Sequence, residues 1–467
     1  MSPTEKRRFY KTLFQLAVPI TIQNTITSSL NLVDTIMIGQ LGATEVAAVG
    51  LANRLFFIFI LVSFAISSGT AVFTAQYWGK KDVAEIGKVM GIALIFNGVI
   101  AVLFSIAALI DPAKVMAVFT TDAQVIHQGS LYLAITAFSF LPTAITMLYS
   151  FVLRSTGNVT IPMYASTSAL VLNTVLNYCM IFGHFGFPAL GVKGAAIATL
   201  IARFIEMAFI VSVTYLKRLP AVRWRDFLSV PTGLIKTFLI TTAPILANEF
   251  IWVMGNTTYS IVFGRMGTAE IAAVNIIKPI EEISFSLFFG LASAASVMIG
   301  NQIGAGNEDI AHAYAKRFSI IGPVGAVVAG CLIALNAHHV IHLFRVPREV
   351  LDFSINMIFI LSVVLWIRIF NIISIVGVFR GGGDTRYSLY IEALSVWVVG
   401  VPLAFLGGFF WKLPVYWVFA LINLEEVFKM IMSLYRLYSK KWIHNLVGGT
   451  TPPKAMKYEK GKDSNPI

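Results

Sequence analysis

Charged residues are scarce in this chain. Only 12% of its 467 residues are Asp, Glu, Lys or Arg, whereas 57% are hydrophobic. A soluble domain carries about twice that share of charged residues, so the composition excludes a soluble protein. Uncharged stretches such as 89–110, 318–344 and 393–411 are long enough to cross a bilayer as helices, which takes roughly 20 residues. Their length also excludes a membrane β-barrel, whose strands are about 10 residues long with alternating polarity.

Cysteine is almost absent as well. The two thiols, Cys179 and Cys331, fall in hydrophobic stretches far apart in the sequence, so we predict packing thiols rather than a disulfide. A catalytic grouping, such as a histidine with a glutamate or a nucleophile with a base, is also missing at helical spacing. The protein is therefore not expected to be an enzyme.

Basic residues exceed acidic ones, 35 to 23, which gives a formal net charge of +12. Such an excess can indicate nucleic-acid binding, but here the basic residues gather in alternate connections between the apolar stretches. These connections are 6–11, 80–88, 217–225, 316–317 and 436–441 with the tail beyond. By the positive-inside rule this side is cytoplasmic. Both termini are therefore expected inside the cell, and nucleic acid is not an expected partner.

The sequence repeats itself at an interval of 225 residues. Identical residues stand at this interval in several places: Pro19 and Pro244, Gly39 and Gly264, Gly42 and Gly267, and Gly79 and Gly304. Past one added residue, the same alignment pairs Arg154 with Arg380. In a strongly apolar chain, duplicated halves indicate a transporter that works between two lobes.

Hydropathy predicts twelve membrane-spanning helices, six in each half. They are expected near 13–37, 47–76, 89–110, 131–153, 161–183, 192–216, 237–262, 272–301, 317–340, 354–379, 388–410 and 414–437. Because six spans per half bring both repeats into the membrane from the same side, the pseudo-twofold axis should run along the membrane normal. The expected fold is an all-α membrane protein. Its parts are an N-terminal lobe (1–220), a cytoplasmic linker (221–236), a C-terminal lobe (237–440) and a disordered cytoplasmic tail (441–467).

The first predicted helix carries an unusual polar stripe. Asn24, Ser28, Asn31 and Asp34 recur at helical spacing, and such a stripe should face protein or water rather than lipid. A carboxylate near the middle of the membrane costs roughly 3 kcal/mol or more unless it is protonated, paired or bound to a cation. Asp34 is therefore a candidate functional group. The alternative is a helix-end aspartate at the outer interface, since the Gly39 turn follows closely.

Other polar side chains offer partners for such a carboxylate. Asn173 and Asn177 stand one turn apart on one predicted helix, and Thr199 lies on the next. Carboxylate, amide and hydroxyl oxygens are hard ligands of the kind that alkali cations accept. The alternative is that the two asparagines merely join helices by hydrogen bonds.

The second half replaces this arrangement with a different acid. The repeat places Tyr259 opposite Asp34, and Glu249 forms a stripe at helical spacing with Trp252, Asn256 and Tyr259. A carboxylate beside aromatic rings suits an organic cation, through charge pairing and cation–π contact. We predict that these four residues bind substrate together with Asn31. A buried structural carboxyl at Glu249 is the alternative.

Residues 33–50 (VDTIMIGQLGATEVAAVG), their echo at 259–275 (YSIVFGRMGTAEIAAVN) and the two Arg-Gly loops resemble the multidrug and toxic compound extrusion (MATE) family, over about residues 10–440. The resemblance implies a V-shaped pair of six-helix bundles around a central cavity. It also implies antiport of organic, often cationic, compounds against sodium ions or protons.

The resemblance further implies a cation-coupling site in the N-terminal lobe. Asp34, Asn173, Asn177 and Thr199 match the family's positions, and Asn177 stands where some members carry a second acid. With one carboxylate, the site suits one proton or one sodium ion. The sequence does not choose between Na⁺ and H⁺. No other metal and no cofactor are expected.

The resulting prediction is a monomeric efflux antiporter in the inner membrane, with small organic molecules and membrane lipid as partners. The rival is a flippase for a lipid-linked saccharide, which would need many basic residues in the cavity to hold pyrophosphate. Few Lys or Arg residues lie within the predicted spans, among them Arg203, Arg368 and Lys429, which favours efflux.

Overall fold

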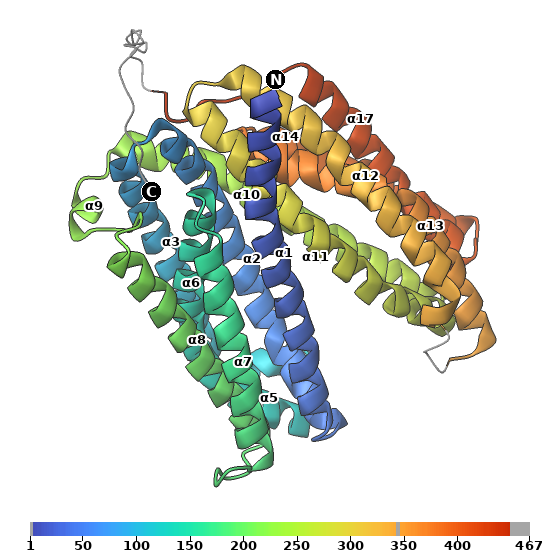
Figure 1. The fold of residues 1–467 in the computed structure, drawn as a ribbon. Helices are drawn as coiled ribbons and strands as arrows, with labels where there is room; N and C mark the ends of the chain where they lie inside the picture. Colours follow the sequence, from blue (N-terminus) through green and yellow to red (C-terminus); the bar gives the residue numbers. More distant parts are fainter. Residues whose placement is uncertain (1–2, 342–345, 449–467) are drawn as a thin grey trace, which may run out of the picture.

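The computed structural model describes residues 3–341 and 346–448, without the side chains of 28–32, 228 and 340 (Figure 1). All regular structure in these residues is helical. The helices of the first half are α1 (Pro3–Gly39), α2 (Ala43–Lys80), α3 (Val83–Ile110), α4 (Pro112–Ala117), α5 (Ala123–Thr136), the 3₁₀ turn η1 (Ala137–Ser139), α6 (Phe140–Ser155), α7 (Thr160–Phe182), α8 (Val192–Leu216) and α9 (Trp224–Leu228).

The helices of the second half follow the same order. They are α10 (Thr232–Met266), α11 (Thr268–Gly304), α12 (Glu308–Ile341), α13 (Arg348–Ile372), the π-helical segment η2 (Ile373–Phe379), α14 (Thr385–Leu394), the π-helical segment η3 (Ser395–Gly400), α15 (Val401–Phe405), the π-helical segment η4 (Leu406–Phe410), α16 (Val415–Ile422) and α17 (Leu424–Tyr438). Several of these segments follow one another without a break in one continuous helix, such as α14, η3, α15 and η4.

The predicted helical ranges all lie in helical structure, but the helices extend beyond the apolar stretches. Ten helical segments are long and apolar enough to cross a membrane among the described residues. The two predicted spans outside these ten are α1, which carries the polar stripe, and α16–α17, where Glu425, Glu426 and Lys429 interrupt the apolar run. Hydropathy is low in both for the same reason, which is polar side chains within the helix.

The two halves of the chain form separate groups of helices. Helices α2 to α8 lie on one side of the molecule and α11 to α17 on the other, and the groups meet near the start of α1 and separate toward the opposite end (Figure 1). The first helix of each half also packs against the other half. Phe9 and Leu13 of α1 join a core with Phe318 of α12, while Phe238 of α10 packs with Phe73 of α2.

The backbones of α2 and α11 touch at the end of the molecule where the two groups meet. A Cβ atom on Gly304 would lie 1.8 Å from the carbonyl oxygen of Gln76, and one on Gly79 would lie 2.0 Å from that of Asn301. Gly79 and Gly304 correspond in the repeat, so each half contributes the same glycine to this contact. We call this end of the molecule the closed end.

The two cysteines are both free and lie on different helices. Cys179 on α7 is buried, which confirms the prediction of a packing thiol, whereas Cys331 on α12 is exposed. The prediction was therefore wrong for Cys331, because apolar sequence does not distinguish a helix face in the core from one on the outer surface.

Residues 441–448 are ordered against both halves, so the predicted disordered tail was wrong for this part. The Trp442 side chain is fully buried and packs on Gly382. The backbone N–H of His444 donates to the Gly382 carbonyl at 2.8 Å. The amide of Gln76, on α2 of the first half, donates to the His444 carbonyl at 3.0 Å. We call 441–448 the C-terminal strap. The rest of the predicted tail, 449–467, lies outside the described residues.

Replacing Trp442 by alanine is expected to destabilise the protein by about 3 kcal/mol, because truncating a buried aromatic side chain leaves a cavity. The measurement is the thermal unfolding midpoint of detergent-purified protein. The matched control is Trp224→Ala, since Trp224 is 81% exposed. Equal midpoints for the two variants would show that the strap adds nothing to stability.

Candidate functional site

A cavity of about 1170 Å³ lies between the two halves. Helices α1, α2, α5, α6, α7 and α8 line it from the first half, and α10, α11, α13, η2, α14 and α17 from the second. This volume exceeds the roughly 300–1,000 Å³ of a typical small-molecule pocket. The cavity is therefore large enough for a drug-sized ligand and its hydration water.

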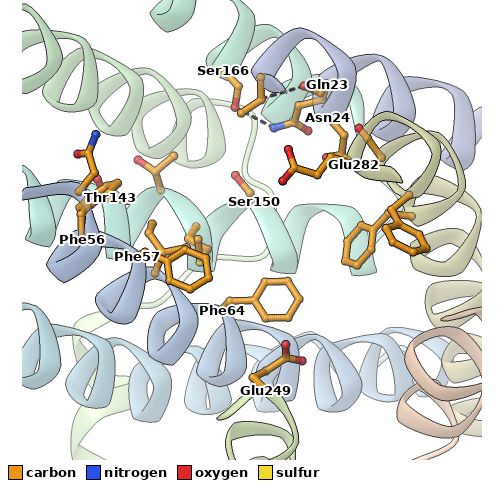
Figure 2. A pocket seen from close by; sticks show the side chains of 18 of the residues that line it. Gln23, Asn24, Phe56, Phe57, Phe64, Thr143, Ser150, Ser166, Glu249 and Glu282 are labelled. Carbon is orange, nitrogen blue, oxygen red and sulfur yellow. Dashed lines mark hydrogen bonds between the residues drawn. The ribbon is translucent and has the colours of Figure 1, made fainter. Parts of the chain in front are cut away.

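Aromatic rings form much of the cavity wall. The rings that line it are those of Phe56, Phe57, Phe64, Tyr132, Phe151, Trp252, Phe285 and Phe289. Phe64 of the first half faces Phe289 of the second with ring centroids 6.3 Å apart, and Phe64 appears between the two walls in Figure 2. Rings contributed from both sides can hold a flat organic molecule between the halves.

The four predicted cation-coupling residues lie together on the first-half wall. Asn177 Nδ2 donates to Asp34 Oδ1 at 2.8 Å, and also to Asn173 Oδ1 at 3.3 Å. Thr199 Oγ1 is 3.4 Å from Asn173 Nδ2. Asp34, Asn177 and Thr199 line the cavity, whereas Asn173 is buried behind them. We call these residues the Asp34 group. Its role in cation binding stays a prediction.

The Asn173 amide fits its neighbours better when its oxygen and nitrogen are exchanged. In that orientation Nδ2 donates to both carboxylate oxygens of Asp34, at 3.0 and 3.1 Å, and Oδ1 accepts from the Thr199 backbone N–H at 3.2 Å. Both asparagines then donate to the same carboxylate. Charge-assisted hydrogen bonds of this kind stabilise the ionised form of an acid.

A second chain of polar contacts runs along the first-half wall from α6 to α8. Arg154 donates to Gln23 Oε1 at 2.6 Å. Gln23 Nε2 donates to Ser166 Oγ at 2.8 Å (Figure 2). Ser166 Oγ donates to Glu206 at 2.8 Å, and Glu206 pairs with Arg203 at 2.9 Å. The chain links four helices around the cavity.

The second half carries a related network with more charge. Arg380 donates to Asn248 at 2.8 Å and pairs with Glu249 at 2.6 Å. Lys429 lies among three carboxylates, at 3.0 Å from Glu392, 3.4 Å from Glu425 and 3.3 Å from Glu426. A buried ammonium of this kind is tolerated only because the surrounding acids compensate its charge.

The two networks occupy equivalent positions of the repeat, allowing for small differences in loop length. The equivalent pairs are Gln23 and Asn248, Arg154 and Arg380, Ser166 and Glu392, Arg203 and Glu426, and Glu206 and Lys429. The sign of the charge is therefore exchanged between the halves on α8 and α17. The Arg–amide contact of α6 with α1 recurs unchanged, as the contact of Arg380 with Asn248 on α10.

Comparison with known proteins supports this duplicated architecture. A model of the MatE family matches residues 19–179 and, separately, residues 244–406. The chain belongs to the MatE family. The two matched segments begin 225 residues apart, which confirms the internal repeat, and together they cover more than half of the chain.

Relatives of this MatE protein include transporters named for drug resistance. It is 25% identical over 443 residues to the "Probable multidrug resistance protein NorM" of Thermotoga maritima, covering 92% of this chain and 93% of that protein. It is also 25% identical over 453 residues to the "Probable multidrug resistance protein YoeA" of Bacillus subtilis, covering 94% and 95%.

Solved MATE structures share the fold. A structure described as the outward-facing conformation of a multidrug resistance MATE family transporter matches with a TM-score of 0.84 at 21% identity, covering 92% of this chain and 96% of that chain. The family and the ten apolar helices together identify a multi-pass membrane transporter that handles small molecules.

The predicted substrate stripe on α10 is not brought together in this MatE protein. Glu249 and Trp252 line the cavity, but Asn256 and Tyr259 do not. Tyr259 is 7% exposed and its hydroxyl donates to Glu425, while Asn256 donates to the Trp252 carbonyl. The prediction was wrong for Tyr259, because this residue packs on η3 and reaches Glu425 of α17. Asn256 is exposed, and its contact with substrate stays a prediction. The side chain of Asn31 lies outside the described residues.

Arg154 and Arg380 line the cavity, which the sequence does not predict. Each follows an apolar stretch and precedes a glycine, a pattern that predicts a helix-ending turn at the membrane surface. The helices do end there, but both guanidinium groups reach back to the cavity wall. Long arginine side chains can extend in this way from a helix end. Their correspondence in the repeat was the available signal.

Proposed function

We propose that the protein exports organic cations by antiport with a sodium ion or proton that binds at the Asp34 group. The observation that carries this proposal is a carboxylate on the cavity wall that accepts from an amide of α7, with the Thr199 hydroxyl of α8 within hydrogen-bond distance of the second amide, Asn173. Oxygen ligands of this type suit a small hard cation. The drug-resistance names of the relatives support the export of toxic compounds.

The charge of the cavity favours a cationic substrate. Six carboxylates line it (Asp34, Glu206, Glu249, Glu282, Glu392 and Glu426), against five basic side chains (Arg154, Arg203, Arg368, Arg380 and Lys429). All but one of the basic groups pair with an acid. A flippase for lipid-linked saccharides would need unpaired basic groups for pyrophosphate, and Arg154 alone does not supply them. The flippase alternative is therefore not favoured.

The proposed membrane arrangement adds two spans to the ten apolar segments. Helix α1 and the consecutive helices α16 and α17 would supply the eleventh and twelfth spans, which completes two lobes of six. Their hydropathy is low because they carry polar side chains, and these side chains face the cavity or the neighbouring helices. The basic ends of α2, α8 and α17 would place the closed end in the cytoplasm by the positive-inside rule. The cavity would then face outward, in a monomer in the inner membrane.

Cation binding at Asp34 supplies a driving force for alternation between outward and inward openings. A cation that enters from outside neutralises Asp34 and weakens its hydrogen bonds to Asn177 and Asn173, which frees the end of α1 to move against α7. Exchange of one sodium ion or proton for one organic monocation moves no net charge across the membrane, so the chemical gradient of the ion drives export. A ten-fold gradient of the ion supplies about 1.4 kcal/mol, which corresponds to a ten-fold concentration ratio of the exported cation.

Transport in proteoliposomes tests the proposal. Purified protein is reconstituted with ethidium on one side, and a sodium or a proton gradient is imposed, one at a time. We expect one of these gradients to drive ethidium in the direction opposite to the flow of the ion. Ethidium transport should stop when an ionophore dissipates that gradient. Movement under neither gradient, or in empty liposomes equally fast, would contradict the proposed antiport.

A further inference from the structure

One acid on the second-half wall is left without a partner by every network described above. Glu282 lies on α11, lines the cavity and is exposed to it. Its carboxylate has no hydrogen bond or ion pair with any residue in the described part of the chain. The carboxylate of the preceding residue, Glu281, pairs with Arg368 at 2.7 Å. We propose that Glu282 is the residue that holds the positive charge of the transported molecule. This assignment rests on the proposed export of organic cations.

The other carboxylates of the cavity already have partners. Glu206 and Glu249 are paired with arginines, and Glu392 and Glu426 with Lys429. The Asp34 carboxylate accepts from Asn177. A ligand cation that bound one of the four paired glutamates would compete with an internal cation, and breaking a buried pair is costly. Asp34 is assigned to the coupling ion. Glu282 can bind a cation by exchanging only water.

The surroundings of Glu282 suit an aromatic cation. Phe285, Ser286 and Phe289 follow it at i+3, i+4 and i+7 on α11, and all three line the cavity. Phe289 faces Phe64 across the cavity. The helix thus offers a carboxylate and two rings in one row, which matches a flat organic monocation.

The position of Glu282 also separates it from Glu249. Glu282 lies on the same side of the cavity as Gln23 and Asn24, and Glu249 lies on the opposite side (Figure 2). A charge bound at Glu282 is therefore held away from the Arg380 guanidinium that neutralises Glu249.

The repeat gives a second argument that Glu282 has a task of its own. Its counterpart 225 residues earlier is Phe57, which lines the cavity from the first half. Two further pairs of corresponding cavity-lining positions are apolar in both halves: Ile60 corresponds to Phe285 and Phe64 to Phe289. The acid is thus a departure from an apolar wall. In the first half, Asp34 is likewise an acid without an acidic counterpart, since the corresponding residue of the second half is Tyr259. Ion coupling and substrate recognition are assigned to different halves.

The test measures ethidium binding to the purified protein by fluorescence polarisation. We expect Glu282→Gln to weaken binding at least ten-fold and Glu282→Asp to weaken it only a few-fold. The matched control is Glu308→Gln, which removes an exposed carboxylate at the start of α12 and should bind like the wild type. Glu282→Gln binding within two-fold of the wild type would overturn the assignment.

A second readout separates recognition from coupling. The thermal midpoint of Glu282→Gln should still respond to sodium ions or pH as the wild type does, because the Asp34 group is intact. Loss of that response would overturn the assignment by making Glu282 a coupling group. Absence of binding by the wild-type protein to ethidium and other organic cations would instead contradict the proposed function.

Discussion

Replacing Asp34 by asparagine is expected to reduce ion-driven export of ethidium at least ten-fold. The asparagine keeps the size of the side chain and can still accept from Asn177, so the protein should fold. An asparagine cannot compensate the charge of a sodium ion or take up a proton. Asp34 supplies the single carboxylate among the four residues of the Asp34 group. The measurement is export from proteoliposomes under the gradient that drives the wild type.

The control for this variant is Asp352→Asn, which makes the same chemical change at an exposed position on α13 outside the cavity lining. It should export like the wild type. Thermal unfolding adds an equilibrium measurement, because a cation at 100 times its Kd stabilises the folded state by about 2.7 kcal/mol. Asp34→Asn should lose that stabilisation. Full export by Asp34→Asn would rule out the proposed coupling mechanism.

Replacing Gly304 by alanine is expected to destabilise the protein by about 2 kcal/mol or more. The new Cβ would lie 1.8 Å from the Gln76 carbonyl oxygen on α2, so the two backbones must move apart. Backbone atoms of packed helices cannot turn aside as a flexible side chain can, and overpacking of this kind commonly costs about 1–3 kcal/mol. The thermal midpoint in detergent measures the loss.

The control for this substitution is Gly98→Ala on α3, where a Cβ would meet nothing within 4 Å. Alanine should be neutral or slightly stabilising there, because it reduces the freedom of the unfolded chain. A Gly304→Ala midpoint equal to that of Gly98→Ala would show that the closed end is not held by this crossing. The contact between α2 and α11 must also separate if the cavity opens at the closed end. Because Gly304→Ala weakens this contact, the variant should favour the inward opening.

The sequence predicted the Asp34 group well because its residues follow simple helical rules. Asn173 and Asn177 are one turn apart on α7, and polar side chains in an apolar helix must turn toward protein or water. Those constraints, with the family resemblance, sufficed to select residues that the structure places within hydrogen-bond distance.

The same rules failed for the stripe on α10. Glu249, Trp252, Asn256 and Tyr259 do share helical spacing, but one helix can face a cavity along part of its length and another helix along the rest. Tyr259 reaches Glu425, which is 166 residues away in the chain. A stripe at helical spacing therefore does not show which residues on it line the cavity and which pack on another helix.

The C-terminal strap was also hidden from the sequence. Residues 441–448 lie at the start of a tail that is rich in Gly, Pro and Lys from Val447 on, a composition typical of disorder. Trp442 nevertheless finds a site on Gly382, where the absence of a side chain leaves room for its ring. The partner segments come from α2 and from the loop before α14, which are distant in the chain.

The sequence by itself determined the class of the protein, its helices, its duplication and its family, because these depend on composition, spacing and self-similarity along the chain. Only the tertiary structure decided which charges are compensated. It paired Glu249 with Arg380, surrounded Lys429 with acids, and left Glu282 free on the cavity wall. The physical reason is that the free energy of a buried charge depends on groups within a few ångströms of it. In this fold those groups come from helices far apart in sequence.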